Sequence, residues 1–120
     1  MKRLVMIVFA IGILIGLTAC GDSTEGMVLL QQESSPNEDY IAYVYNYSLG
    51  ATNPSGEKVY LSRSDGTDRT EVFNALGYDC SIAWTDNTSL VIMVLKSGTQ
   101  DYFRINTMMD KWNDVVISYN

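Results

Sequence analysis

The sequence predicts a small all-β domain, built as a single antiparallel sheet, a sandwich or an open meander of six to eight strands. Short segments rich in Tyr, Val and Ile recur about every 10 residues, with turn-forming residues between them. Apolar and polar side chains alternate along the clearest segment, and no stretch shows convincing helical spacing. These observations favour an all-β architecture with one hydrophobic core.

Residues 39–47 (DYIAYVYNY) carry the clearest strand pattern. They are rich in Tyr, Ile and Val, residues that favour strands. Side chains alternate between the two faces of a strand, so Ile41, Tyr43 and Tyr45 share one face and the residues between them share the other. The apolar run 90–95 (LVIMVL) has strand length, and we expect it to be a central strand covered on both faces.

Turn residues separate the remaining expected strands. Residues 48–57 contain two Gly and one Pro and predict a loop, and Asp65-Gly66 is a strong hairpin dipeptide. We expect residues 74–79 to be a connection and residues 107–114 to form at most one helical turn. The other expected strands are 58–63, 71–73, 81–85, 101–105 and 115–119, with a short first strand at 27–30.

The first nineteen residues have the pattern of a secretory signal peptide. Lys2 and Arg3 precede an uncharged stretch over residues 4–19 that ends in small residues. At about 1.5 Å of rise per residue, a helix over this stretch is shorter than the roughly 30 Å hydrocarbon core of a bilayer. We therefore expect residues 1–19 to be a cleaved signal peptide.

The end of this segment, Leu17-Thr18-Ala19-Cys20, resembles the lipobox of bacterial lipoproteins. The resemblance implies that the Cys20 thiol receives a diacylglycerol and that cleavage falls just before it. Cys20 then becomes the first residue of the mature chain, attached to the membrane by lipid, since two or more acyl chains hold a protein stably. The alternatives are a signal peptide cut elsewhere and an uncleaved anchor helix.

The expected organisation is a signal peptide at 1–19, a lipid-attached tether at 20–34 and a small all-β domain at 35–120. The resemblance places the protein in the bacterial cell envelope. Gly21 stands where Asp would match the retention signal for the inner membrane of Gram-negative cells. The resemblance therefore implies the periplasmic face of the outer membrane in a Gram-negative host, and otherwise the outer face of the plasma membrane.

The mature chain is strongly acidic. Removing Lys2 and Arg3 from the eight basic residues leaves six, against fourteen acidic residues, for a formal charge of −8. Phosphates are bound mainly by Lys and Arg, so we expect no nucleic-acid partner. The acidity is explained by solubility, and an acidic recognition surface is the alternative.

The sequence carries no recognisable catalytic constellation. It has no His, so it lacks the commonest general base and metal ligand, and we expect no enzyme activity, metal or cofactor. With Cys20 lipidated, Cys80 is left without a partner, and we interpret it as a small buried apolar residue rather than a reactive thiol or an intermolecular disulfide. The paired carboxylates lie in expected turns, where Asp bonds its own backbone: Asp65/Asp68, Asp79/Asp86 and Asp110/Asp114.

Tyrosine is the notable surplus. Tyr43, Tyr45, Tyr47 and Tyr60 fall in the first two clear strands. Tyrosine is large and keeps a polar tip, so these residues are a possible recognition surface. The alternative is that they flank the core and form hydrogen bonds at its rim.

Residues 35–44 (SPNEDYIAYV) resemble the opening of a Tol-type β-propeller blade, which reads Ser-Pro-Asp-Gly-x-x-Ile-Ala-Phe/Tyr. Asn37 and Glu38 replace the usual Asp and Gly. A closed propeller needs four or more blades, and this chain holds at most about two. The resemblance therefore implies the strand-turn pattern without the closed propeller.

The chain is also similar to a group of small bacterial proteins of unknown function. The matched positions span residues 35 to about 92, and Leu49 stands where the group has a Cys, which puts a shared disulfide in doubt. The resemblance implies an architecture and no activity. The matches are Ser35, Pro36, Tyr40, Ala42 to Val44, Gly50 to Thr52, Val72, Phe73, Trp84, Asp86 and Asn87.

Together these observations predict a lipoprotein with a non-catalytic binding or accessory role, held on the membrane through Cys20 and touching an envelope protein partner. One alternative is an inhibitor of an envelope hydrolase of the lysozyme type. A second is a carboxylate-dependent enzyme acting on glycans, which would need two carboxylates facing across a cleft.

Overall fold

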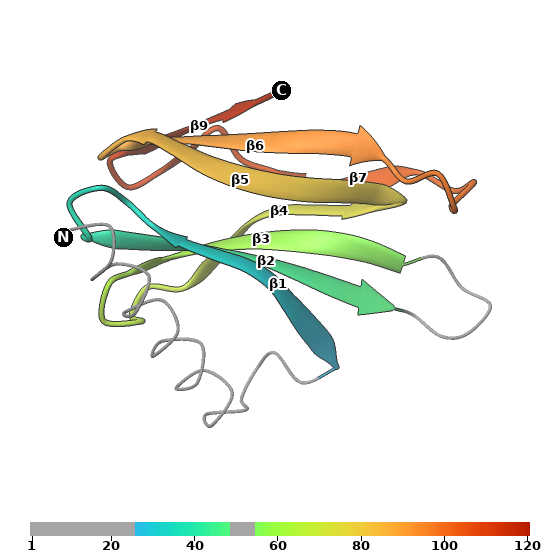
Figure 1. Cartoon of the computed structure of the whole chain (residues 1–120), viewed down its shortest axis with the longest axis horizontal. Coiled ribbons are helices and arrows are strands. Elements are labelled where there is room, and N and C mark those ends of the chain that lie inside the picture. The colour runs from blue at the N-terminus through green and yellow to red at the C-terminus, as the bar shows by residue number, and fades with distance from the viewer. Residues whose placement is uncertain (1–25, 49–54) are drawn as a thin grey trace, which may run out of the picture.

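A computed structural model describes residues 26–48 and 55–120, and these residues form nine β-strands in two sheets. The sheets have strand orders β1-β2-β3-β4-β7 and β5-β6-β9-β8. Figure 1 shows β5, β6 and β9 as one layer and β1 to β4 as the other. The strands are β1 (Met27–Ser34), β2 (Tyr40–Ser48), β3 (Ser55–Arg63), β4 (Thr70–Leu76), β5 (Tyr78–Asp86), β6 (Ser89–Lys96), β7 (Arg104–Met108), β8 (Lys111–Trp112) and β9 (Val115–Tyr119).

The predicted all-β class is confirmed, and of the architectures considered the chain adopts two stacked sheets. The nine strands exceed the expected six to eight, because the two-residue β8 was not predicted. The expected signal peptide, the lipidation residue Cys20 and residues 49–54 of the expected loop lie outside the described residues.

The first strand begins the domain earlier than predicted. β1 pairs with β2 from Met27↔Tyr47 to Ser34↔Ile41, so the residues 27–34 belong to the sheet and not to a tether. The polar sequence Gln-Gln-Glu-Ser suggested a tether. At the edge of a sheet, however, half-exposed positions accept polar side chains. Residues Met27–Ser34 therefore belong to the folded sheet, ahead of the expected boundary at residue 35.

The expected alternation in β2 is confirmed by its pairing with β3. Ala42 lies opposite Leu61 and Val44 opposite Val59, and all four side chains face the other sheet. Tyr43 lies opposite Tyr60, with both side chains on the outer face of the five-stranded sheet. One strand thus supplies both the core and an outer aromatic face.

The core lies between the sheets, and buried apolar side chains from both fill it. The five-stranded sheet contributes Ala42, Val44, Val59, Leu61 and Phe73, and the four-stranded sheet contributes Ile82, Leu90, Ile92, Trp112 and Ile117. Trp84 packs against this core from a partly buried position. Burying such side chains contributes about 1.5–3 kcal/mol each, which makes the contact between the sheets the main source of stability.

Side chains of the five-stranded sheet bond the free edge of β5. The Glu57 carboxylate accepts a hydrogen bond from the Cys80 N–H at 2.6 Å. The Gln31 amide accepts from the Ile82 N–H at 3.0 Å and donates to the Ile82 carbonyl at 2.9 Å. Buried backbone groups need partners, so these bonds complete the edge strand as a neighbouring strand would.

The apolar run 90–95 is not covered on both faces, contrary to the prediction. β6 lies inside its sheet, between β5 and β9, but Leu95 is 71 % exposed and the outward-facing Met93 is only half-buried. No described element packs on the outer face of this sheet. β6 also pairs in parallel with β9, over Ser89–Ile92 and Val116–Tyr119. The other paired strands of the described residues are antiparallel, as predicted, and this pair is the exception.

The segment between β6 and β9 also differs from the prediction. The strand expected at 101–105 lies at Arg104–Met108, where β7 pairs with β4. The helical turn expected at 107–114 is replaced by the end of β7 and by β8, which pairs with β9. These strands are short, so tertiary pairing overrides their weak local pattern.

Gly77 makes the break between β4 and β5, where a longer connection was expected. Its φ of +83° favours glycine, and its N–H donates to the Ser55 carbonyl at 2.9 Å. A Cβ on Gly77 would lie 2.1 Å from the Tyr102 carbonyl oxygen and 2.7 Å from Phe103. Only glycine therefore fits between these backbones.

We expect Gly77→Ala to lower the free energy of unfolding by about 2–5 kcal/mol, because strain at positive φ adds to a backbone clash. Gly66→Ala is the matched control, since Gly66 has a φ of +86° but nothing within 4 Å of its Cβ position. We expect it to lose about 1–2 kcal/mol. Urea unfolding measures both values, and equal losses would contradict the close-contact explanation.

Glu57 makes stability depend on pH. Burial raises the pKa of its carboxyl, partly opposed by the hydrogen bond from Cys80. The folded chain therefore binds this proton more tightly than the unfolded chain, whose reference pKa is 4.5. Its contribution to stability is full below that pKa and is lost as the pH rises through the raised folded pKa.

We expect Glu57→Gln, whose amide oxygen can still accept from Cys80, to gain stability relative to wild type as the pH rises from about 4.5 to about 7. Asp101→Asn makes the same charge change at an exposed position and should show a flatter difference. Chemical unfolding across this pH range measures both. Identical pH profiles for the two variants would contradict the assignment to Glu57.

Candidate functional site

The outer face of the five-stranded sheet carries a second apolar cluster. Ile41, Tyr43 and Tyr45 of β2 form its centre, and Met27, Leu29 and Tyr60 pack against it from the neighbouring strands. The register explains the grouping, because Tyr45 lies opposite Leu29 of β1 and Tyr43 lies opposite Tyr60 of β3. Three of the four tyrosines predicted as a recognition surface thus come together.

Arg69, which immediately precedes β4, lies over these tyrosines. Its guanidinium carbon is 4.7 Å from the ring centre of Tyr43, 5.2 Å from that of Tyr45 and 4.9 Å from that of Tyr60. Its Nη2 donates a hydrogen bond to the Tyr45 hydroxyl at 2.6 Å. Attraction to the ring faces holds the cation in place. We call Tyr43, Tyr45, Tyr60 and Arg69 the tyrosine–arginine cluster.

The rings of the cluster are arranged with defined geometry. Tyr43 and Tyr45 stack with an interplanar angle of 21° and ring centres 6.3 Å apart. Tyr60 stands edge-on to Tyr45 at 87°. Such pairs contribute about 0.5–1.5 kcal/mol beyond the area that they bury, so the cluster is a rigid feature of the face.

The tyrosine hydroxyls also make specific contacts. The hydroxyls of Tyr43 and Ser62 share a hydrogen bond of 2.9 Å. Burial raises the pKa of Tyr43, and the bond to Ser62 and the charge of Arg69 lower it in part. The alternative interpretation, in which the tyrosines form hydrogen bonds at the rim of the core, predicts bonds of this kind.

Tyr47 lies apart from the cluster, at the end of β2. Its hydroxyl donates to Asn74 at 2.6 Å, and the Lys58 ammonium lies 4.9 Å from its ring centre. Lys58 in turn pairs with Glu71 at 3.5 Å. Tyr47 therefore belongs to a neighbouring polar network and not to the cation site of Arg69.

The four predicted tyrosines differ in accessibility. Tyr43 is 2 % and Tyr45 is 3 % exposed, so these two rings form the floor of the face. Tyr47, Tyr60 and Arg69 are half-buried. A recognition role for the tyrosines stays a prediction, and any contact would be made first with the half-buried residues.

Two polar atoms at this face are buried without a hydrogen-bond partner. Within residues 26–48 and 55–120, Gln32 Oε1 and Arg69 Nε are the buried side-chain nitrogen or oxygen atoms in this state. Gln32 lies opposite Tyr43 in the register, so its side chain emerges on the same face. Sequence reasoning missed both residues, because neither stands in a motif and only the strand pairing brings them to the tyrosines.

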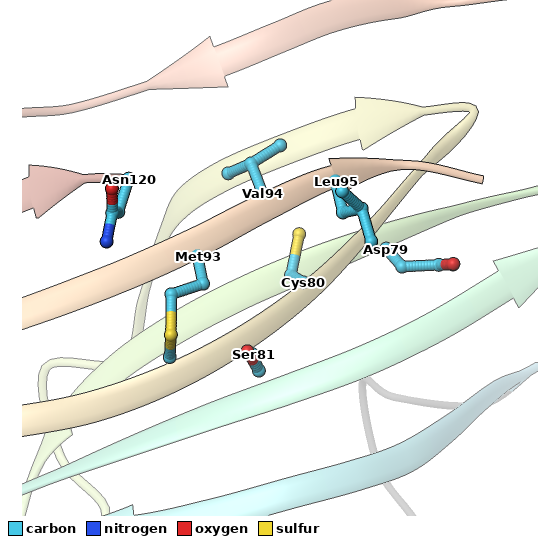
Figure 2. Close-up of a pocket in the computed structure, with 7 residues that line it drawn as sticks. All are labelled: Asp79, Cys80, Ser81, Met93, Val94, Leu95 and Asn120. Carbon is cyan, nitrogen blue, oxygen red and sulfur yellow. The ribbon is translucent and has the colours of Figure 1, made fainter.

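A separate hollow of about 520 Å³ lies over β5 and β6. Figure 2 shows its lining side chains, which come from these two neighbouring strands and from Asn120. The lining residues are Asp79, Cys80, Ser81, Met93, Val94, Leu95 and Asn120. None of its described lining residues is cationic, and Asp79 is acidic. The hollow therefore would not stabilise a bound anion or a Cys80 thiolate.

Cys80 is not an activated thiol. Burial and the nearby Glu57 and Asp79 carboxyls raise its pKa to about 12. Its partly buried side chain packs against the core, and the cysteine is free. This setting agrees with the interpretation of Cys80 as a small apolar residue of the core.

The paired carboxylates have structural roles where the structure shows their contacts. Asp65 accepts hydrogen bonds from the N–H of Thr67 at 3.0 Å and from its hydroxyl at 2.6 Å, and Asp86 accepts from the Thr88 N–H at 2.9 Å. These bonds lower the pKa of both carboxyls. Among the described residues no group of His, Cys, Asp or Glu could hold a metal ion.

Comparisons with known proteins gave no match to a family model, a curated protein or a solved structure. Within the described part of the chain, no helix is long and apolar enough to cross a membrane.

We expect Cys80 to react with a disulfide reagent at least about 100-fold more slowly in the native chain than in urea. At about pH 8, a thiol with a pKa of about 12 is only about 1 part in 10,000 ionised, and burial also blocks access. The release of the coloured thiolate measures the rate, and Cys80→Ser defines the background. Similar rates in the two states would show that Cys80 is accessible and ionisable.

Proposed function

We propose that the protein is a lipid-anchored binding protein of the bacterial cell envelope, with no catalytic role. The observation that carries this proposal is Leu17-Thr18-Ala19-Cys20, placed behind a basic start and an apolar segment. A diacylglycerol on Cys20 would hold the domain at a membrane surface. On this proposal the chain works by contact with neighbours within reach of its anchor.

The contact surface in this proposal is the outer face of the five-stranded sheet, around the tyrosine–arginine cluster. Tyr and Arg are enriched among the residues that dominate binding energy at protein interfaces. Tyr60 and Arg69 are half-buried and supported by the rings beneath them, so little side-chain freedom would be lost on binding. These features support an envelope protein as partner.

Mass spectrometry and detergent partitioning test the anchor. We expect the mature chain to begin at Cys20 with the mass of an attached diacylglycerol, and to partition into the detergent phase. Cys20→Ala should abolish both properties without changing the fold, since residue 20 precedes β1. A mature chain that carries no lipid and stays in the aqueous phase would overturn the proposal.

Photo-crosslinking in intact cells, from a reactive residue at position 58 beside the cluster, tests the contact face. We expect a specific protein adduct that Tyr60→Ser reduces at least about tenfold. Ser81→Ala, an exposed change on the other sheet, is the matched control and should leave the adduct unchanged. Equal adduct formation by both variants would contradict the proposal that this face contacts the partner.

A further inference from the structure

Among the described residues, no carboxylate forms an ion pair with the positively charged Arg69 guanidinium. In the described parts of the chain, Lys58 pairs with Glu71 and Arg63 lies 4.0 Å from Asp68, and no such ion pair forms at Arg69. The neighbouring Asp68 carboxylate is instead bonded by Asn113 at 2.8 Å. A half-buried cation without a counter-ion is costly, and the three ring faces offset only part of that cost.

The guanidinium also has unused hydrogen-bonding capacity. It has five N–H donors in a planar fork, and among the described residues only the Tyr45 hydroxyl accepts from it. Its Nε is buried, and none of the described residues accepts a hydrogen bond from it. A carboxylate has the shape and charge that match such a fork, and charge-assisted bonds of this kind are short and strong.

Gln32 has an unpaired hydrogen-bond acceptor on the same face. Its Oε1 is a buried acceptor without a donor, and the residue lies directly opposite Tyr43 in the strand register. A ligand that satisfies both atoms must carry an anionic acceptor for Arg69 and a donor for Gln32. A peptide with an acidic side chain has both, since its backbone N–H donates and its carboxylate accepts.

We infer that the tyrosine–arginine cluster, with Gln32, binds an acidic side chain and an adjoining backbone N–H of an extended peptide segment in the partner. The carboxylate of Asp or Glu accepts hydrogen bonds from the Arg69 guanidinium, and the peptide N–H donates to Gln32 Oε1. The inference rests on the proposed function and names the chemistry of the partner. The overall negative charge of the domain repels acidic segments elsewhere, which confines recognition to this position.

A pair of blocked amino acids tests the inference on the purified mature chain, labelled for NMR. The probe is N-acetyl-glutamate N-methylamide, and its neutral isostere is N-acetyl-glutamine N-methylamide. We expect the probe to shift the Arg69 Nε–H and Tyr60 ring resonances in a saturable way, at least about tenfold more tightly than the isostere. Arg104, on β7, should not respond at the same concentrations.

Two outcomes overturn the inference. One is a response that is unsaturable or equal for the probe and its isostere. The other is an equal response of Arg69 and Arg104, which would show only non-specific attraction of anions to arginine. Arg69→Lys keeps the charge but loses the planar fork, and should weaken binding of the probe about tenfold or more while leaving the fold intact.

The failure of this inference is distinguishable from failure of the proposed function. Suppose that the chain is lipidated and forms the crosslink but does not bind the acidic probe. The proposed anchor and partner would then stand, and only the claim that the cluster recognises a carboxylate would be wrong. If the chain carries no lipid but binds the probe saturably, the inference about the binding site is supported and the proposed anchoring in the cell envelope is contradicted.

Discussion

The fold depends on how the free edge of β5 is completed. This strand lies at the margin of the four-stranded sheet, next to the inner face of the other sheet, where unpaired backbone groups are costly. Glu57 and Gln31 supply the missing partners, and Trp84 adds a bond from its indole N–H to the Glu33 carbonyl at 2.9 Å. Directional bonds thereby fix the lateral position of two sheets whose apolar contact alone would tolerate sliding.

Closing that edge leaves the opposite face of the five-stranded sheet free for another use. Successive side chains in β2 point to opposite faces, so Ala42 and Val44 enter the core while Tyr43 and Tyr45 gather on the outside. The outer residues are large, aromatic and organised around one cation. A face that merely kept the sheet soluble would need only small polar side chains.

The sequence predicts most of the strands, because turn residues and alternating patterns are local signals. β2 and its two faces follow directly from the residues 39–47. The second half of β1 has the composition of a tether, because polar residues at a sheet edge resemble linker residues. Arg69 and Gln32 could not be predicted from the sequence, because pairing across the four strands β1 to β4 places them beside the tyrosines and leaves no mark in local spacing.

The parallel pairing of β6 with β9 bears on the order in which the chain can acquire its structure. Because β9 lies between β6 and β8, the four-stranded sheet lacks its inner member until residues 115–119 are present. Until these residues are synthesised, the edge of β6 that pairs with β9 has no partner strand. Pairing of residues so far apart in the sequence forms slowly, and an unpaired strand edge makes the incomplete chain prone to aggregation.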